Sequence, residues 1–165
     1  MKLKISILQV EQVTQKYVDW YSDNEVVKFS ENQHRKFSLE GQINYVASCL
    51  KNPSVDLYGI FDDNLHIGNI ALSGINSVHK VAEIIYVVGE RTYWGKGVAT
   101  FAFQEIIKLA KNKYNLHKVI VGTSEQNMSS KRVLEKNNFV LEGRRIDHLY
   151  FNGTFHNQLD YGLIL

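Results

Sequence analysis

The chain has 165 residues, 44% hydrophobic and 22% charged, which fits a globular protein long enough to bury a sizeable core. Its 19 Lys and Arg against 17 Asp and Glu leave a formal net charge of +2, too small a surplus to favour nucleic acid as a partner. The single cysteine and six scattered histidines show no metal-ligand spacing, and no apolar run approaches the roughly 20 residues that span a bilayer, so we expect a cytoplasmic protein with neither a metal nor a membrane partner.

The first half of the chain predicts a strand, a helical region and a hairpin. Residues 2–10 alternate as a strand, residues 11–29 predict one or two short helices, and residues 38–50 predict a helix capped by Ser38. This last helix places four apolar residues on one face: Ile43, Val46, Ala47 and Leu50. Residues 56–75 form two apolar runs around Asp-Asp-Asn, and this favours a hairpin because Asp and Asn tolerate positive φ.

The second half predicts alternating strands and helices before a terminal hairpin. Residues 81–88 continue the sheet, and residues 97–114 carry an apolar stripe of period 3.6 that predicts a helix. A strand at 117–124 and a helix at 127–138 come next. The chain ends in two strand-like runs around Asn152-Gly153, a dipeptide that strongly favours a hairpin turn.

The resulting element order, β-αα-βββ-α-β-α-ββ, predicts an α+β (mixed α/β) fold. One largely antiparallel sheet of about seven strands would be flanked by about four helices. No linker, repeat or low-complexity tract interrupts the sequence, so residues 1–165 predict a single domain.

Two glycines one residue apart, Gly95 and Gly97, join the strand at 81–88 to the next helix. Without a Cβ, the backbone there can turn tightly and leave the first amides of the helix free to bind an anion, with Lys96 adding positive charge. The spacing lacks the GxGxxG of dinucleotide folds and the lysine-serine end of a Walker loop. A turn without any ligand is the alternative interpretation.

The stretch "AEIIYVVGERTYWGKGVAT", followed by "NMSSKRVLEKNNF", resembles the core signature of the GCN5-related N-acetyltransferase (GNAT) superfamily. The resemblance is to its RimJ/RimL-like branch, which includes ribosomal-protein and spermidine N-acetyltransferases. It implies acetyl-CoA as co-substrate, held by the glycine turn and by two splayed central strands. The cofactor-binding residues that it implies are Val87, Val88, Thr92, Trp94, Gly95, Lys96, Gly97, Val98, Ala99, Thr100, Asn127 and Ser130.

One residue departs from the family pattern at the glycine turn. Thr92 occupies the position where the family has Arg or Gln, and Arg91 is displaced from it by one residue. This change weakens a side-chain contact more than the turn itself, which depends on the main chain.

Glu83 is the candidate general base. Acetyl transfer needs a neutral amine, and a lysine-like amine costs roughly 4.6 kcal/mol to deprotonate at pH 7. Glu83 lies at the edge of an apolar run, where partial desolvation would raise its pKa, and it matches the glutamate base of several GNAT enzymes. An ordinary exposed strand glutamate is the alternative.

A proton donor for the leaving thiolate is harder to place. The resemblance would put a tyrosine at position 134, but the residue is Leu134, which excludes that mechanism. Ser130 matches a serine that lies close to the sulfur in RimL-like enzymes, and a water could serve instead. Alternatively, Ser130 only satisfies the first turn of a helix capped by Asn127. A non-catalytic acyl-CoA-binding module therefore remains the rival hypothesis.

The acceptor is predicted to be a small-molecule amine or a peptide N-terminus. The resemblance implies Glu25, Lys28, His148 and Tyr150 as substrate contacts. Residues 21–37 and 144–158 mix both charges with a small positive surplus, which favours an anionic acceptor such as a nucleotide-linked amino sugar, then a peptide amine, then a polyamine or aminoglycoside. The resemblance also leaves a homodimer open.

Overall fold

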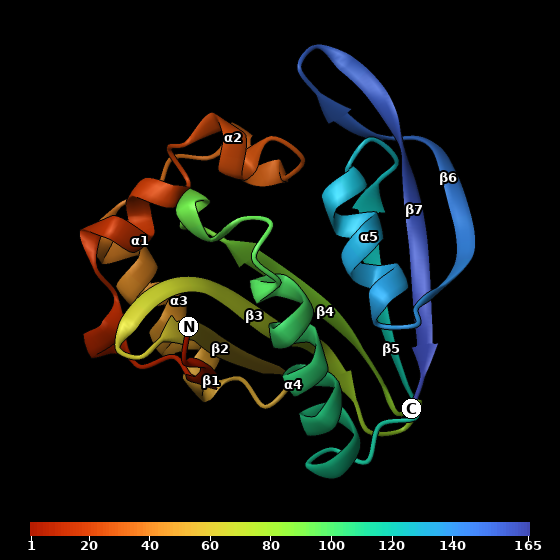
Figure 1. Ribbon diagram of the computed structural model, residues 1–165, viewed down its shortest axis with the longest axis horizontal. Coiled ribbons are helices and arrows are strands. Elements are labelled where there is room, and N and C mark those ends of the chain that lie inside the picture. The colour runs from red at the N-terminus through yellow and green to blue at the C-terminus, as the bar shows by residue number, and fades with distance from the viewer.

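A seven-stranded sheet runs through the chain and carries helices on both faces (Figure 1). The computed structural model describes residues 1–165. The strand order is β1-β2-β3-β4-β5-β7-β6, and every neighbouring pair is antiparallel except β4 and β5. The strands are β1 (Leu3–Ile7), β2 (Val55–Asp62), β3 (Leu65–Asn76), β4 (Val81–Val88), β5 (Lys118–Ser124), β6 (Val140–Phe151) and β7 (Thr154–Ile164).

Five α-helices and three short 3-10 helices complete the fold. The α-helices are α1 (Gln15–Trp20), α2 (Asn24–Val27), α3 (Leu39–Lys51), α4 (Val98–Asn112) and α5 (Met128–Lys136); the 3-10 helices are η1 (Val10–Gln12), η2 (Glu31–His34) and η3 (Arg91–Tyr93). The predicted four helices become five because residues 11–29 divide into α1 and α2, with Asp23 as the N-cap of α2. None of the helices combines the length and the apolar character needed to cross a membrane.

The helices bury two separate cores against the sheet. A cluster of 19 buried residues lies on the face covered by α4 and α5. A smaller cluster of 9 buried residues lies on the opposite face, beneath α1 and α3. We call these the α4 face and the α3 face.

The predicted caps and turns are present. Ser38 accepts a hydrogen bond from the Gly41 amide, and Asn127 accepts one from the Ser130 amide at 3.1 Å. Asn152 and Gly153 have φ of 52° and 79°, which gives the expected tight turn between β6 and β7. The mixed, largely antiparallel fold predicted from the sequence is confirmed.

The buried face of α3 differs from the predicted one. The buried residues of this helix are Gln42, Val46 and Cys49, whereas Leu50 is 46% exposed. An amide, rather than a fourth aliphatic side chain, is therefore among the buried residues of this helix. Its apolar stripe could not reveal this, because α3 also borders the cavity described below.

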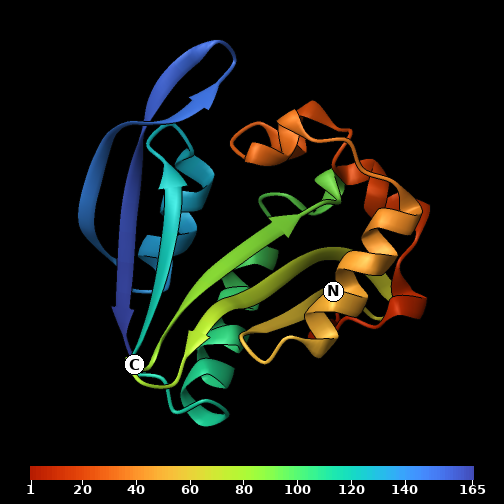
Figure 2. The same cartoon turned by 180° about the vertical axis from the view of Figure 1, so that it is seen from behind.

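The sheet is open between β4 and β5. These two parallel strands pair only over Val81–Glu83 and Lys118–Ile120, and they diverge beyond Glu83 (Figure 2). The divergence separates β1–β4 from a second group made of β5, β6, β7 and α5. The two groups meet at the end of the sheet near the C-terminus.

Candidate active site

A large cleft, with a volume of about 1390 Å³, occupies the opening between the strands and reaches both faces of the sheet. Its walls include the predicted residues Glu25, Lys28, Glu83, Val87, Val88, Trp94, Gly95, Gly97, Val98, Ala99, Thr100, Asn127 and Ser130. Thr92, Lys96, His148 and Tyr150 lie outside this lining. The chain therefore brings most of the predicted site together from segments far apart in the sequence. No group of three or more His, Cys, Asp or Glu side chains is placed to hold a metal ion.

The glycine turn has the geometry of an anion cradle. Gly95 and Gly97 have φ of 73° and 82°, a left-handed conformation that favours glycine, and no protein atom lies within 4 Å of where either Cβ would stand. Gly97 caps α4 without a side-chain hydrogen bond. Four backbone amides at this end have no protein acceptor: Gly97, Val98, Ala99 and Thr100. Open space before unpaired amides fits the phosphates of coenzyme A.

Two cations that the sequence interpretation overlooked line the same cleft. Arg132 and Lys136 are one turn apart on α5, and neither has a carboxylate partner within 4 Å. Lys96, in contrast, directs its ammonium group over the Tyr93 ring at 5.8 Å and does not line the cleft. The i, i+4 spacing of the two basic residues was the available signal for an anionic ligand.

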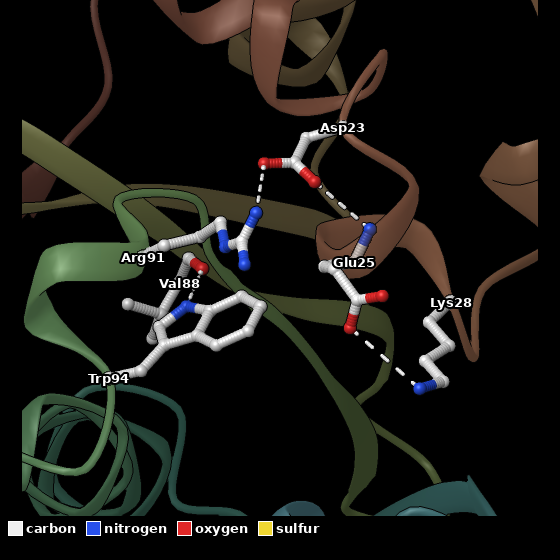
Figure 3. A network of polar contacts seen from close by, with 6 residues as sticks. All are labelled: Asp23, Glu25, Lys28, Val88, Arg91 and Trp94. Atoms are coloured by element: carbon white, nitrogen blue, oxygen red, sulfur yellow. Dashed lines mark hydrogen bonds and ion pairs between the residues drawn. The ribbon is translucent and has the colours of Figure 1, made fainter.

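Side chains around the turn connect it to α2 (Figure 3). The indole N–H of Trp94 donates to the Val88 carbonyl at 2.7 Å, and the Arg91 guanidinium stacks over the Trp94 ring at 5.6 Å. Arg91 also pairs with Asp23 at 3.5 Å, and Glu25 pairs with Lys28 at 3.7 Å. The arginine displaced from the family position therefore links the turn to the start of α2.

Past Glu83, the edge of β4 that faces the opening carries free main-chain groups. The Gly89 amide donates to the Ile67 carbonyl of the β3 side at 3.0 Å. The backbone N–H and C=O groups of successive residues point to alternate edges of a strand. Since Gly89 points toward β3, the groups of Tyr86 and Val88 point toward the opening. The Val88 carbonyl is already occupied by Trp94, so the Val88 amide and both groups of Tyr86 remain available to a ligand.

Glu83 lies on the α3 face at the point where β4 and β5 separate. Solvent reaches the side chain through the open cleft, yet the cleft walls partly desolvate it and so raise its pKa. The negative charge of Asp160 raises the pKa further, and the positive charge of Arg145 opposes the rise. Asp160 and Arg145 are themselves joined by a 2.6 Å ion pair.

This arrangement predicts opposite pKa changes in two variants. Asp160→Asn removes a negative charge and releases Arg145, so the pKa of Glu83 should fall toward its ordinary value. Arg145→Gln removes the opposing positive charge, so the pKa of Glu83 should rise. NMR titration of the Glu83 carboxyl carbon measures both directions. Shifts of the same sign in the two variants would contradict the assigned causes.

Ser130 lies on the α4 face of the cleft, opposite Glu83. It is buried, and its side chain lies near enough to the Tyr86 hydroxyl to lower the pKa of that phenol. Burial raises the pKa of Tyr86, so this phenol stays protonated at neutral pH. Tyr86 was not predicted, although strand alternation already placed it on the opposite face from Glu83.

Leu134 is fully buried in the larger core, where leucine is a packing residue.

The charges near the acceptor end of the cleft are mostly paired. Besides Asp23 and Glu25, Glu31 pairs with Arg35 at 3.5 Å. On β6, Arg144 pairs with Glu125 at 3.0 Å and Arg145 with Asp160. The positive surplus counted from the sequence is therefore largely neutralised within the protein, and it gives less support to an anionic acceptor than the sequence suggested.

The two predicted contacts on β6 lie near the end of the terminal hairpin. His148 lies 3.4 Å from an Arg145 nitrogen, and the Tyr150 ring packs against Phe155 with centroids 5.0 Å apart. The Tyr150 carbonyl lies 3.2 Å from Nε2 of His34 in η2, so the hairpin touches the segment that follows α2. Their role as substrate contacts stays a prediction.

The sequence also matches the family model described as "Acetyltransferase (GNAT) domain" over residues 7–140. The chain belongs to the GNAT acetyltransferase family. The family prediction from the glycine turn is thus confirmed, and so is acetyl-CoA as the co-substrate of that family. A relative is YdaF of Bacillus subtilis (strain 168), whose name places it provisionally among ribosomal N-acetyltransferases; it is 32% identical over 106 residues. That match covers 64% of this chain and 57% of YdaF, so the chain spans less than two thirds of this relative.

Solved structures share the GNAT fold over the whole chain. The spermidine N-acetyltransferase of Vibrio cholerae, in complex with CoA and spermine, superposes with a TM-score of 0.88 at 17% identity, covering 99% of this chain and 95% of its own. RimL, a ribosomal L7/L12 alpha-N-protein acetyltransferase in complex with CoA, gives 0.87 at 20% identity, covering 100% and 95%. At such identities the likeness shows the fold.

Proposed function

We propose that the protein is an acetyl-CoA-dependent N-acetyltransferase that transfers acetyl directly to a primary amine. The observation that carries the proposal is that one cleft joins the amide cradle to Glu83 through the opening in the sheet. The cradle, Arg132 and Lys136 bind the phosphates, and the free edge of β4 binds the extended arm. Bound acetyl-CoA supplies an acetyl group as a thioester.

The residues on the two faces divide the proton transfers. Glu83, with its raised pKa, accepts a proton from the amine as the new N–C bond forms. The C–S bond breaks, and the thiolate receives a proton from the Ser130 hydroxyl, from Tyr86 beside it, or from a water. The hydroxyls of Ser130 and Tyr86 lie on one face of the cleft and Glu83 lies on the other. A proton therefore does not pass directly between these hydroxyls and Glu83.

A small-molecule amine, such as an amino sugar, or a peptide N-terminus is the proposed acceptor. The proposal is supported by relatives named for the acetylation of ribosomal-protein serine and of spermidine N(1), and by the structural neighbour named as an alpha-N-protein acetyltransferase. A cytoplasmic location and a homodimer remain parts of this proposal.

The buried position of Leu134 weakens the rival binding-module hypothesis, because packing alone explains that residue.

The test is CoA thiol release with a panel of primary amines. We expect release to depend on the amine and the acetylated product to appear in equal amount, with acetyl-CoA alone as the control for background hydrolysis. Tight CoA binding without amine-dependent release from any member of the panel would instead support a non-catalytic module.

A further inference from the structure

The α3 face of the cleft contains a group of neutral polar side chains that the reaction does not use. They come from α1, α3 and β3, and all six line the cleft: Tyr17, Tyr21, Gln42, Tyr45, Cys49 and Asn69. We call this group the tyrosine subsite. It lies beyond Glu83 along the sheet, since Ser73 of β3 pairs with Glu83 and Asn69 lies four residues further along the same strand. Four strand residues correspond to about 13 Å.

Two buried polar atoms of the subsite have no hydrogen-bond partner. They are Oε1 of Gln42 and Nδ2 of Asn69, and both side chains are only 4% exposed. Buried polar groups are nearly always paired in folded proteins, because each unpaired group carries a desolvation cost of about 1–3 kcal/mol. Gln42 and Asn69 both line the cleft, but neither of these two atoms is itself exposed to it, so a ligand supplies their partners only by displacing the groups that cover them.

A neighbouring histidine contacts the Asn69 amide. Nε2 of His66 lies 2.8 Å from Oδ1 of Asn69, which leaves Nδ2 as the free end. Burial lowers the pKa of His66, so the ring is neutral, and its tautomer with the proton on Nε2 donates this hydrogen bond. Nδ2 lies near the Tyr21 hydroxyl and lowers the pKa of that phenol, but the two groups do not form a hydrogen bond within 3.5 Å.

The tyrosine subsite holds no charge. Burial raises the pKa of Tyr17, Tyr21 and Tyr45, and the groups that act electrostatically on Tyr17 are the other two tyrosines and Cys49. The carboxylates that line the cleft are Glu25, Glu31 and Glu83, and the first two are paired with cations. Glu90, which acts on His66, is held by Trp20 at 2.9 Å and by Lys16 at 3.0 Å. An ammonium group would find no counter-ion in the subsite.

We propose that the tyrosine subsite binds the far end of the acceptor and selects an uncharged group with both a hydrogen-bond donor and an acceptor, an amide or a hydroxyl. The N–H or O–H of that group donates to Gln42, and its oxygen accepts from Asn69. The apolar side chains of Ile85 and Ala71, opposite each other on β4 and β3, border the path from Glu83. This inference rests on the proposed function, and it favours a peptide or hydroxylated acceptor over a polyamine.

Three acceptors of equal length test the proposal. Each is a straight-chain primary amine chosen to span about 13 Å, and the far end is a carboxamide, a methyl group or a second ammonium. We expect the wild-type protein to give a kcat/KM for the carboxamide at least roughly tenfold above that for the methyl compound, with the diamine lowest. Gln42→Met, which preserves length and volume, should bring the carboxamide and methyl values close together. Gln104→Met, at an exposed position on α4, is the matched control and should leave the ratio unchanged.

Calorimetry with CoA bound separates this proposal from the proposed function, because binding of the same three probes needs no turnover. If no amine is acetylated but the carboxamide binds more tightly than the methyl compound, and Gln42→Met abolishes the difference, the subsite stands and the proposed function fails. If amines are acetylated but the carboxamide has no advantage, or the diamine is preferred, the subsite is overturned and water alone pairs the two buried atoms.

Discussion

Glu83→Gln is expected to lower kcat/KM for acetyl transfer by roughly 10²–10⁴-fold, the range typical of a lost general base. The loss should be greatest at pH values above the raised pKa of Glu83 and below the pKa of the amine, since only there is the base ionised while the amine still carries its proton. The acid limb of the wild-type pH profile should lie above the ordinary glutamate pKa of about 4.3 and should disappear in the variant.

The matched control for this substitution is Glu105→Gln. Glu105 lies on α4, where it pairs with Lys108 at 2.7 Å and does not line the cleft. Its removal should leave both kcat/KM and the pH profile unchanged. A Glu83→Gln protein with the wild-type profile from pH 6 to 9 would remove Glu83 from the mechanism, and a water or another group would have to accept the proton.

Gly97→Val should weaken CoA binding by at least about 100-fold. The valine side chain would enter the open space in front of the unpaired amides, and φ of 82° is strained for any residue with a Cβ, at about 1–2 kcal/mol. Both effects disturb the position of the four amides that we propose hold the phosphates. Isothermal titration calorimetry with CoA measures the affinity, and thermal unfolding reports whether the variant is folded.

Gly153→Val separates backbone strain from loss of the cradle. Gly153 has φ of 79° and, like Gly97, no atom within 4 Å of a Cβ, but it lies in the β6–β7 turn and does not line the cleft. This variant should lose comparable stability and keep its CoA affinity. Wild-type affinity in a folded Gly97→Val protein would show that the phosphates bind elsewhere.

Local signals in the sequence predicted the elements and the donor half of the site. Gly97 and Asn127 were predictable because a left-handed turn and a helix cap each depend on a few adjacent residues. Two splayed central strands were inferred only through the family resemblance, and the position of the opening after Glu83 and Ile120 was not predicted, since pairing between β4 and β5 joins segments separated by a whole helix.

Partners supplied by distant segments were not predictable. Arg145 was counted as a free positive charge, yet it is paired with Asp160 and affects the pKa of Glu83 instead. The burial of Gln42 was not predicted, because periodicity describes an average apolar face and does not show a cavity that borders a buried amide. Tyr86 and Ser130 meet only after β4 and α5 pack together.

The unpaired main-chain groups along the cleft have a consequence for how the family diversifies. Amides at the start of α4 and the free edge of β4 are common to almost any sequence that folds this way, so most side-chain substitutions leave them in place. Thr92, which stands where the family pattern has Arg or Gln, is a side-chain difference of this kind. The backbone that presents these groups can therefore be kept while most side chains change, as the TM-score of 0.88 at only 17% identity shows for the fold.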